Sequence, residues 1–194
     1  MLAVLSGLDP RIGGPPSSAR DIWTAAVGAG IQVSGAVCVG SPPLEGEIAA
    51  TKAMERAGVA IVALPFTRHY GRLAKRWAIS VPLVSWLLRS IKKFDVVQVH
   101  SGWVFSTIAG IVVAKAFRKP TVLIPHESLT RFDINNGPMA KRLTKRVIKF
   151  VLLRLSDKIV FSSWLERDDS VTERFRSKAA VIYHPVADEH TSTV

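Results

Sequence analysis

Two histidines stand at the ends of apolar segments of the kind that form buried strands. His100 follows the run Asp95–Val99, and His126 follows the run Thr121–Pro125. Near neutral pH an imidazole can accept or donate a proton, so each side chain could act as a base or as a hydrogen-bond donor. A histidine that only packs inside a loop is the alternative for each, and the shared position at strand ends favours a common site.

A glycine pair, Gly13 and Gly14, follows the first apolar segment and precedes two prolines and a helical stretch. A helix that begins after such a turn carries partial positive charge and unpaired backbone N–H donors, which suit a phosphate or another anion. Glycine also lets a ligand approach the backbone closely. Ser17 or Ser18 can cap this helix. The alternative is a plain strand-to-helix turn without a ligand.

Further side chains lie beside these candidates. Glu127, next to the second histidine, could orient an imidazole, bind a substrate hydroxyl or remain solvated. Arg11, next to the glycines, could face an anionic ligand or solvent, whereas Asp9 is interpreted as a turn residue. Trp103 and Trp23 fit a hydrophobic core better than a stacking platform.

The elements that must position these residues are short apolar runs that alternate with helical stretches. The predicted strands are Leu2–Ser6, Ile31–Val39, Val59–Leu64, Asp95–Val99, Thr121–Pro125, Lys158–Phe161 and Ala179–Tyr183. The predicted helices are Ser17–Ala29, Glu45–Ala57, Val81–Lys93, Val104–Phe117, Met139–Leu155 and Trp164–Glu173. Nearly continuous apolar strands are typical of a parallel sheet that is covered on both faces.

This alternation predicts an α/β fold: a doubly wound, mostly parallel, Rossmann-like sheet of about seven strands with helices on both faces. Ligands of such sheets bind beyond the carboxyl ends of the strands, near the point where the strand order reverses. The segments Gly7–Pro16, His100–Trp103 and His126–Ser128 are therefore expected to meet at one edge.

The predicted helix Met139–Leu155 carries a cluster of basic residues. They fall within one arc at helical spacing, away from Leu143, Val147 and Val151, and they are Lys141, Arg142, Lys145, Arg146 and Lys149. A basic amphipathic helix of this kind is typical of contact with an acidic membrane surface. The alternative is an ordinary solvated face on a helix that covers the sheet.

Charge and composition bound the remaining possibilities. The net charge of +11 favours anionic partners. Nucleic acid is disfavoured because no RNA-binding aromatic signature and no helix-turn-helix pattern occur. The single cysteine, Cys38, and the absence of zinc-like histidine spacing leave no metal site. Without a signal peptide or a long apolar span, we expect a cytoplasmic protein, peripheral on the inner face of the cell membrane.

Five short segments, taken together in their order along the chain, form a distinctive set. They are Leu8–Pro16, Asp95–Trp103, Pro125–Leu129, Ser156–Ser163 and Val181–Val186. This ordered set resembles the N-terminal, acceptor-side domain of family-4-like glycosyltransferases of the GT-B fold, and the likeness covers nearly the whole chain. Two departures are Glu127-Ser128, where relatives often have glycine and a small residue, and Tyr183-His184-Pro185 in place of Pro-Asn-Gly.

The resemblance implies a retaining hexosyltransferase of polysaccharide biosynthesis. Such an enzyme moves a sugar from a nucleotide-sugar donor to a glycan or lipid-linked acceptor. We expect neither a metal ion nor another cofactor. His126 matches the histidine near the reacting sugar and is the predicted catalytic residue. The predicted acceptor-side residues are Gly13, Gly14, His100, Trp103 and Glu127. The residues predicted to approach the donor diphosphate are Gly13, Gly14 and Arg11.

Domain organisation follows from the length of 194 residues, which fits one domain. We expect the Rossmann-like domain over residues 1–183 and a tail or truncated interdomain linker over 184–194. The family's donor-binding domain has no counterpart here, so the chain is expected to be a fragment, a split subunit whose donor-binding half is a separate chain, or a stand-alone relic. In each case we expect the isolated chain to lack activity. A non-catalytic module that binds a membrane surface or another anionic ligand is the alternative function.

Overall fold

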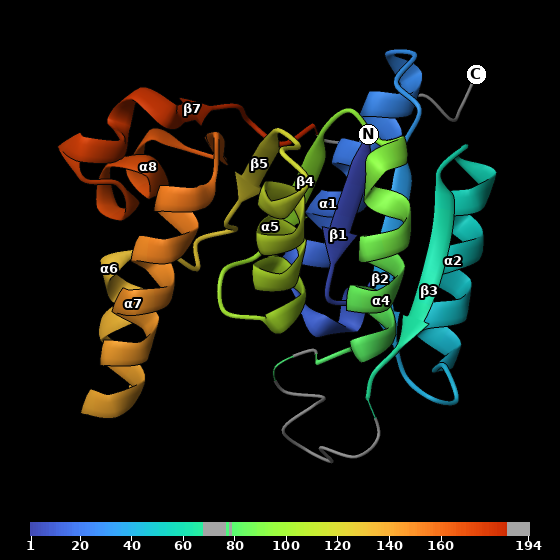
Figure 1. Cartoon of the computed structure of the whole chain (residues 1–194), viewed down its shortest axis with the longest axis horizontal. Coiled ribbons are helices and arrows are strands. Elements are labelled where there is room, and N and C mark those ends of the chain that lie inside the picture. The colour runs from blue at the N-terminus through green and yellow to red at the C-terminus, as the bar shows by residue number, and fades with distance from the viewer. Residues whose placement is uncertain (68–76, 78, 186–194) are drawn as a thin grey trace, which may run out of the picture.

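The computed structural model describes residues 1–67, 77 and 79–185. Its centre is a seven-stranded sheet in which every described strand pair is parallel. The strands are β1 (Leu2–Leu5), β2 (Ser34–Val39), β3 (Ala60–Pro65), β4 (Val97–His100), β5 (Thr121–Ile124), β6 (Lys158–Phe161) and β7 (Ala179–Val181). The predicted doubly wound parallel sheet is confirmed (Figure 1).

The strand order is β3-β2-β1-β4-β5-β6-β7, so the order reverses between β1 and β4. The α-helices are α1 (Gly14–Gly28), α2 (Glu45–Arg56), α4 (Val81–Ser90), α5 (Phe105–Ala116), α6 (Arg131–Asn135), α7 (Met139–Leu155) and α8 (Trp164–Ser170). Short 3-10 helices are η1 (Pro10–Ile12), η3 (Ile91–Lys93) and η4 (Glu173–Lys178). The carboxyl ends of β1, β4 and β5 are neighbours at the reversal, which is where such sheets place their ligands.

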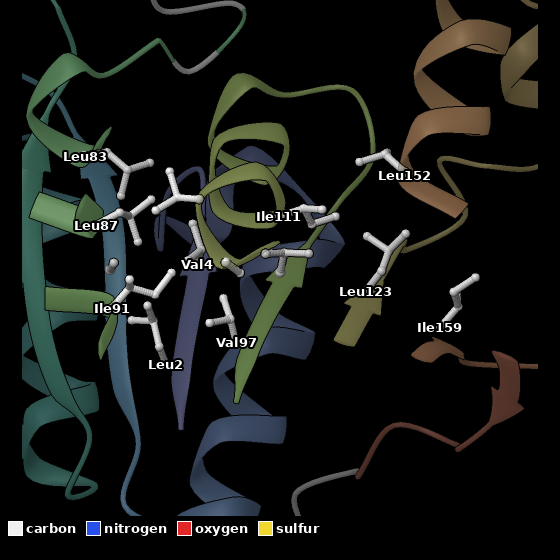
Figure 2. Packing of buried hydrophobic residues seen from close by; sticks show 14 of the residues in the cluster. Leu2, Val4, Leu83, Leu87, Ile91, Val97, Ile111, Leu123, Leu152 and Ile159 are labelled. Carbon is white, nitrogen blue, oxygen red and sulfur yellow. The ribbon is translucent and has the colours of Figure 1, made fainter. Parts of the chain in front are cut away.

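Alternate residues of β1 and β2 enter different hydrophobic clusters on the two faces of the sheet. Leu2 and Val4 of β1 pack with side chains of α4, α5 and α7, and Figure 2 shows this cluster. Ala3 and Leu5 of the same strand pack with Trp23 of α1 and with α2. Burial on both faces explains why these strands are apolar throughout.

Most predicted boundaries move by one to three residues, and Met139–Leu155 and Lys158–Phe161 are unchanged. The prediction for the first helix was wrong at its start, because α1 begins at Gly14 with Gly13 as its N-cap. Proline needs no backbone N–H in the first helical turn, so the two prolines fit inside the helix. Ser17 and Ser18 therefore lie within α1 and do not cap it.

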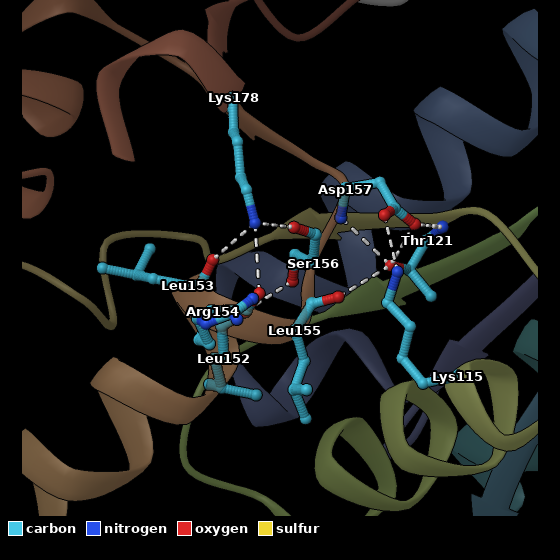
Figure 3. A network of polar contacts seen from close by, with 9 residues as sticks. All are labelled: Lys115, Thr121, Leu152, Leu153, Arg154, Leu155, Ser156, Asp157 and Lys178. Atoms are coloured by element: carbon cyan, nitrogen blue, oxygen red, sulfur yellow. Dashed lines mark hydrogen bonds and ion pairs between the residues drawn. The ribbon is translucent and has the colours of Figure 1, made fainter. Parts of the chain in front are cut away.

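Polar contacts join the amino-terminal ends of β5 and β6 to each other and to neighbouring helices (Figure 3). The Asp157 carboxylate accepts hydrogen bonds from the backbone N–H of Thr121 at 2.8 Å and from Lys115 Nζ at 2.6 Å. Lys178 donates to the carbonyl oxygens of Ser156 and Arg154 at the end of α7. A cation at a helix C-terminus satisfies free carbonyls and complements the helix dipole.

Candidate functional site

The backbone after β4 and β5 takes left-handed conformations that residues other than glycine rarely adopt. Ser101 has a φ of 70°, and the consecutive residues His126 and Glu127 have φ values of 49° and 62°. Each such residue costs on the order of 1–3 kcal/mol and persists only where the surroundings impose it. This clustering at the strand-order reversal marks the loops after β4 and β5 as a candidate site.

A cavity of about 310 Å³, which we call the histidine cavity, opens at this position. It is lined by Gly14, Pro15 and Ser18 of α1, by His126 and Glu127 after β5, by Ser162 after β6 and by His184 after β7. The structure therefore brings together the first glycine of α1, the second histidine and Glu127, as the sequence predicted for the strand ends. The volume lies at the lower end of the range of small-molecule sites.

The imidazole of His126 stacks on that of His100, which lies between His126 and Trp23. The ring centroids lie 5.2 Å apart with an interplanar angle of 17°, and His100 Nδ1 lies 2.9 Å from His126 Nε2. Burial, together with the charge of His184, lowers the pKa of His126 to about 4. Burial lowers the pKa of His100 well below its ordinary value. Both imidazoles are therefore neutral near pH 7.

His100 itself is 0% exposed and does not line the cavity, so its contact with an acceptor stays a prediction. The sequence located it correctly at a strand end. It could not show that His100 is the last residue of β4, whose side chain enters the core beside Trp23.

Ser162 and His184 are site residues that the sequence reasoning missed. The His184 ring centroid lies 5.4 Å from that of His126. Both residues follow strands, Ser162 after β6 and His184 after β7. The rule that singled out the other histidines, a polar residue after an apolar strand, would have found them. Residues 186–194, most of the predicted tail 184–194, lie outside the described residues.

Glu166 of α8 is a second residue that was missed, and it holds two of these loops together. Its carboxylate accepts from the backbone N–H of Glu127 at 2.7 Å and from the backbone N–H of Ser162 at 2.8 Å. Ser163 caps α8 by accepting from the Glu166 N–H. The spacing Ser163-x-x-Glu166 is that of a capping box, which was the available sequence signal.

The glycine turn offers fewer donors than the sequence suggested. The Gly13 N–H donates to the Pro10 carbonyl at 3.2 Å, and the two prolines that follow Gly14 have no N–H. Of residues 13–16, only Gly14 keeps a backbone donor free for a ligand. The helix dipole still favours an anion here. The expected group of several free N–H donors was therefore wrong.

Arg11 does not line the histidine cavity. Its guanidinium donates to both carboxylate oxygens of Asp9: Nε to Oδ1 at 3.0 Å and to Oδ2 at 3.1 Å, and Nη2 to Oδ2 at 2.7 Å. The side-chain hydrogen bond from Arg11 holds the pKa of Asp9 below its usual range. Both residues line a separate cavity of about 410 Å³ against α2, with Arg20. Asp9 caps η1, which confirms its interpretation as a turn residue.

Trp103 lines a different and larger cavity of about 440 Å³ between the β4–α5 loop and α7. Its indole N–H donates to the Asp133 carboxylate, which also pairs with Lys145 Nζ at 2.7 Å. The ammonium of Lys145 lies 5.3 Å from the centroid of the Trp103 ring, a cation–π contact. Trp77 forms another aromatic part of this wall.

The basic cluster predicted on α7 does not form one solvent-facing arc. Lys145 is 7% exposed, and Lys149 donates inward to the Leu129 carbonyl at 2.8 Å. Lys141 and Arg146 remain exposed, whereas Arg142 is half-buried. The error arose because periodicity shows that residues share an arc but not whether that arc faces the core.

The outward face of α7 carries apolar side chains instead. Met139 is 74%, Leu143 62%, Val147 56% and Phe150 49% exposed. We call these four residues the α7 stripe. Phe132 of α6, 81% exposed, is a further exposed aromatic residue next to this helix.

A family model described as Glycosyltransferase Family 4 matches residues 12–190. The chain belongs to Glycosyltransferase Family 4. No curated protein sequence matches it significantly. The ordered motifs therefore indicated the correct family, although none of them alone was specific.

Solved structures share the fold of this Family 4 chain. MurG from Acinetobacter baumannii is 12% identical over 83% of this chain and 40% of its own, with a TM-score of 0.51. A UGT transferase from Siraitia grosvenorii in complex with UDP is 12% identical over 94% of this chain and 50% of its own, with a TM-score of 0.57. The chain thus spans half or less of these GT-B glycosyltransferases and corresponds to one Rossmann-like half.

A third structure shows why fold likeness alone does not identify the activity. A putative short-chain alcohol dehydrogenase from Burkholderia multivorans is 13% identical over 94% of both chains, with a TM-score of 0.51. Rossmann-like sheets support many chemistries, so the family match decides between them.

No group of three or more His, Cys, Asp or Glu side chains in the described part of the chain could hold a metal ion. Within the same residues, no helix has the length and apolar character needed to cross a bilayer.

Proposed function

We propose that this Family 4 chain is the acceptor-side half of a retaining hexosyltransferase, which transfers a sugar from a nucleotide-sugar donor to a glycan or lipid-linked acceptor. The observation that carries the proposal is the histidine cavity: a glycine at a helix N-terminus faces a neutral histidine at the strand-order reversal. The UDP held by the UGT transferase, which shares this fold, supports a nucleoside diphosphate as the leaving group.

Each lining group has a role that its chemistry allows. The Gly14 N–H and the dipole of α1 attract the diphosphate of the donor. His126 contacts the transferred sugar, and Glu127, exposed beside it, binds an acceptor hydroxyl. The cavity beside Trp103 receives the rest of the acceptor, because an aromatic wall beside an ion pair suits a ligand with apolar and polar parts. Stabilisation of the leaving diphosphate by cations comes from a donor-binding half.

The test expresses the native reading frame that holds this chain together with whatever follows the codon for Val194 or lies in a neighbouring frame. Purified protein is incubated with labelled nucleotide sugars and lipid-linked or glycan acceptors. We expect sugar transfer when a donor-binding half is present and none from residues 1–194 alone. Absence of transfer from every donor by the complete assembly, with the fold verified by circular dichroism, would overturn the proposal.

We further propose that the α7 stripe places the protein on an anionic membrane surface, where lipid-linked acceptors reside. The exposed apolar side chains of the stripe supply burial in the lipid interface. Arg146, which is exposed, lies beside Leu143 and Phe150 at i+3 and i−4 spacing on the helix surface, and the net charge is +11. An apolar stripe next to a basic side chain on a cationic protein favours a lipid surface with negative headgroups.

Co-sedimentation with vesicles tests this contact. We expect binding to phosphatidylglycerol–phosphatidylcholine vesicles and little binding to phosphatidylcholine alone. The double variant Leu143→Ser, Val147→Ser should lose at least about tenfold in vesicle affinity, since each side chain buried in the interface contributes more than 1 kcal/mol. The matched control Val81→Ser, Val112→Ser changes residues of 55% and 48% exposure on other helices and should bind normally. Equal binding by both variants, or sedimentation without vesicles through self-association, would contradict the proposal.

A further inference from the structure

Behind His126 lies a chain of buried polar groups with a defined direction. The Trp23 indole Nε1 lies 3.1 Å from His100 Nε2, and His100 Nδ1 lies 2.9 Å from His126 Nε2. Trp23 and His100 are both 0% exposed, so water does not compete for these bonds. The Trp23 N–H and the ring nitrogens of His100 must therefore find their hydrogen-bond partners among neighbouring side chains.

Trp23 sets the position of the first proton. An indole nitrogen can only donate, so His100 Nε2 must accept and must carry a lone pair. A cationic His100 would have hydrogens on both nitrogens and would leave the Trp23 N–H without an acceptor. Burial, which lowers the pKa of His100, acts in the same direction. His100 is therefore neutral and carries its one ring proton on Nδ1.

Gln98 is the remaining polar neighbour of this nitrogen. Its amide oxygen lies 3.1 Å from His100 Nε2, and an oxygen at that place would need a proton on Nε2. A half-turn of the amide brings its NH2 group there instead. The single lone pair of Nε2 is then shared by the Trp23 N–H and the Gln98 NH2, and neither contact requires a proton on Nε2.

The proton position in His100 also fixes the proton position in His126, which lines the cavity. Because His100 Nδ1 donates, His126 Nε2 must accept, and the neutral His126 ring carries its proton on Nδ1. No described residue forms a hydrogen bond with His126 Nδ1, and His126 lines the cavity. We propose that Trp23 and His100 are positioning residues that fix the tautomer of His126, so that its free Nδ1–H is held ready to donate to an oxygen atom of the bound ligand.

This arrangement has a chemical consequence. The only free ring nitrogen of His126 carries a hydrogen, so the side chain donates a hydrogen bond and does not remove a proton from the acceptor. A hydroxyl of the transferred sugar or a phosphate oxygen of the donor supplies the matching acceptor atom. The identity of that ligand rests on the proposed function, whereas the order of protons in the rings does not.

Long-range ¹H–¹⁵N spectra of the untagged chain, labelled with ¹⁵N in its five histidines, test the proposal directly. Ring nitrogens with a hydrogen and with a lone pair give separate signals. Spectra of His126→Asn and His184→Asn variants assign the site rings. At pH 7.5 we expect Nδ1–H and a bare Nε2 in both His100 and His126. An Nε2–H signal from either ring would overturn the proposal.

Three variants identify the side chain that fixes the tautomers of His100 and His126. Trp23→Phe keeps an aromatic ring but removes the donor, and we expect both histidines to move mainly to the Nε2–H form as the Gln98 carbonyl then accepts. Gln98→Leu retains Trp23 and should leave both tautomers unchanged. Trp86→Phe makes the same substitution in the other hydrophobic cluster and serves as the control.

Unchanged spectra in Trp23→Phe, or a tautomer change in Gln98→Leu, would overturn the role of Trp23. If Trp23→Phe fails to fold, the wild-type spectrum still tests the predicted order. Because these signals report ring protons and not turnover, a failure here leaves the transferase proposal standing. A negative transfer assay likewise leaves the tautomer result in place.

Discussion

The two central histidines are held neutral by burial, and their chemistry follows from that. An ordinary histidine has a pKa of about 6.5 and would be partly charged at cytoplasmic pH. His126, with a pKa of about 4, cannot serve as an acid at pH 7. As a fixed hydrogen-bond donor it can still stabilise charge that develops on a ligand oxygen in the transition state.

The first residue-scale prediction concerns transfer activity. We expect His126→Ala to lower the turnover of the complete transferase by about 100-fold, because it removes the preorganised Nδ1–H donor. Asparagine keeps an N–H donor near the position of Nδ1 and tolerates the left-handed backbone better than alanine does, so His126→Asn is the control and should lose less. Steady-state kinetics measure the change, and thermal unfolding of the same variant verifies the fold. Turnover within twofold of wild type would remove His126 from the mechanism.

The second residue-scale prediction concerns pH. The pKa of His126 is about 4 in the folded chain and about 6.5 when unfolded, so the unfolded chain binds more protons between these values. The free energy of unfolding therefore rises with pH across this window, is fully present above pH 6.5 and is lost as pH falls toward 4. The contribution of His126 is on the order of 3 kcal/mol, and His100 adds to it in the same direction.

Urea denaturation at intervals from pH 4 to 8 measures this dependence. His126→Asn removes one of the titrating groups, so its unfolding free energy should fall less steeply than that of wild type below pH 6.5. Parallel pH profiles for the two proteins would show that His126 is not neutralised by the fold.

At the scale of elements, the site depends on short loops whose backbone is fixed by neighbouring helices. The carboxylate of Glu166 in α8 joins the loops after β5 and β6, although α8 contributes no residue to the cavity. Sequence periodicity predicted α8 itself, but the partners of Glu166 depend on how β5 and β6 lie side by side. Long-range contacts of this kind are invisible to local pattern.

Glu166→Gln tests this link. Glu166 is 5% exposed, and an amide nitrogen in place of one carboxylate oxygen leaves the backbone N–H of Glu127 or Ser162, each in a partly buried contact, without this acceptor. We expect a loss of about 1–3 kcal/mol in the free energy of unfolding. Glu173→Gln, at an exposed carboxylate with a surface ion pair, is the control and should change it by less than about 0.5 kcal/mol. A loss no larger than that of the control would show that Glu166 does not brace the loops.

The end of α5 offers a prediction with the opposite sign. Arg118 has a φ of 56°, and its N–H and that of Lys119 donate to the Lys115 and Ala114 carbonyls, as in a Schellman motif. Glycine adopts this conformation without steric cost, so Arg118→Gly should stabilise the chain by about 1 kcal/mol. Arg118→Ala loses the same side chain but keeps the strain, and it should not. Equal unfolding free energies for the two variants in urea would contradict the assignment.

For the whole molecule, the net charge of +11 sets how the chain meets anionic surfaces. A purely electrostatic contact would disappear as salt shortens the Debye length from about 8 Å at physiological strength to about 3 Å at 1 M. The α7 stripe adds an apolar contribution that salt does not screen. We therefore expect vesicle affinity to fall with added salt to a plateau and not to zero.

Vesicle binding from 0.05 to about 1 M NaCl measures this plateau, which should vanish in Leu143→Ser, Val147→Ser. Duplex DNA provides the contrasting partner, because non-specific contacts with it are electrostatic and are lost steeply with salt. Complete loss of vesicle binding at high salt would mean that charge alone carries the contact.

The alternation of apolar runs and helices by itself determined the parallel α/β sheet, because strands covered on both faces must be apolar throughout. The order of short motifs likewise determined the family. Only the tertiary structure decided which polar residues reach the cavity. It turned Arg11 toward Asp9, buried His100 and Lys145, exposed the α7 stripe and brought His184 to His126. The physical reason is that a local pattern places a residue on an element, whereas the packing of elements decides which face of it meets solvent, core or ligand.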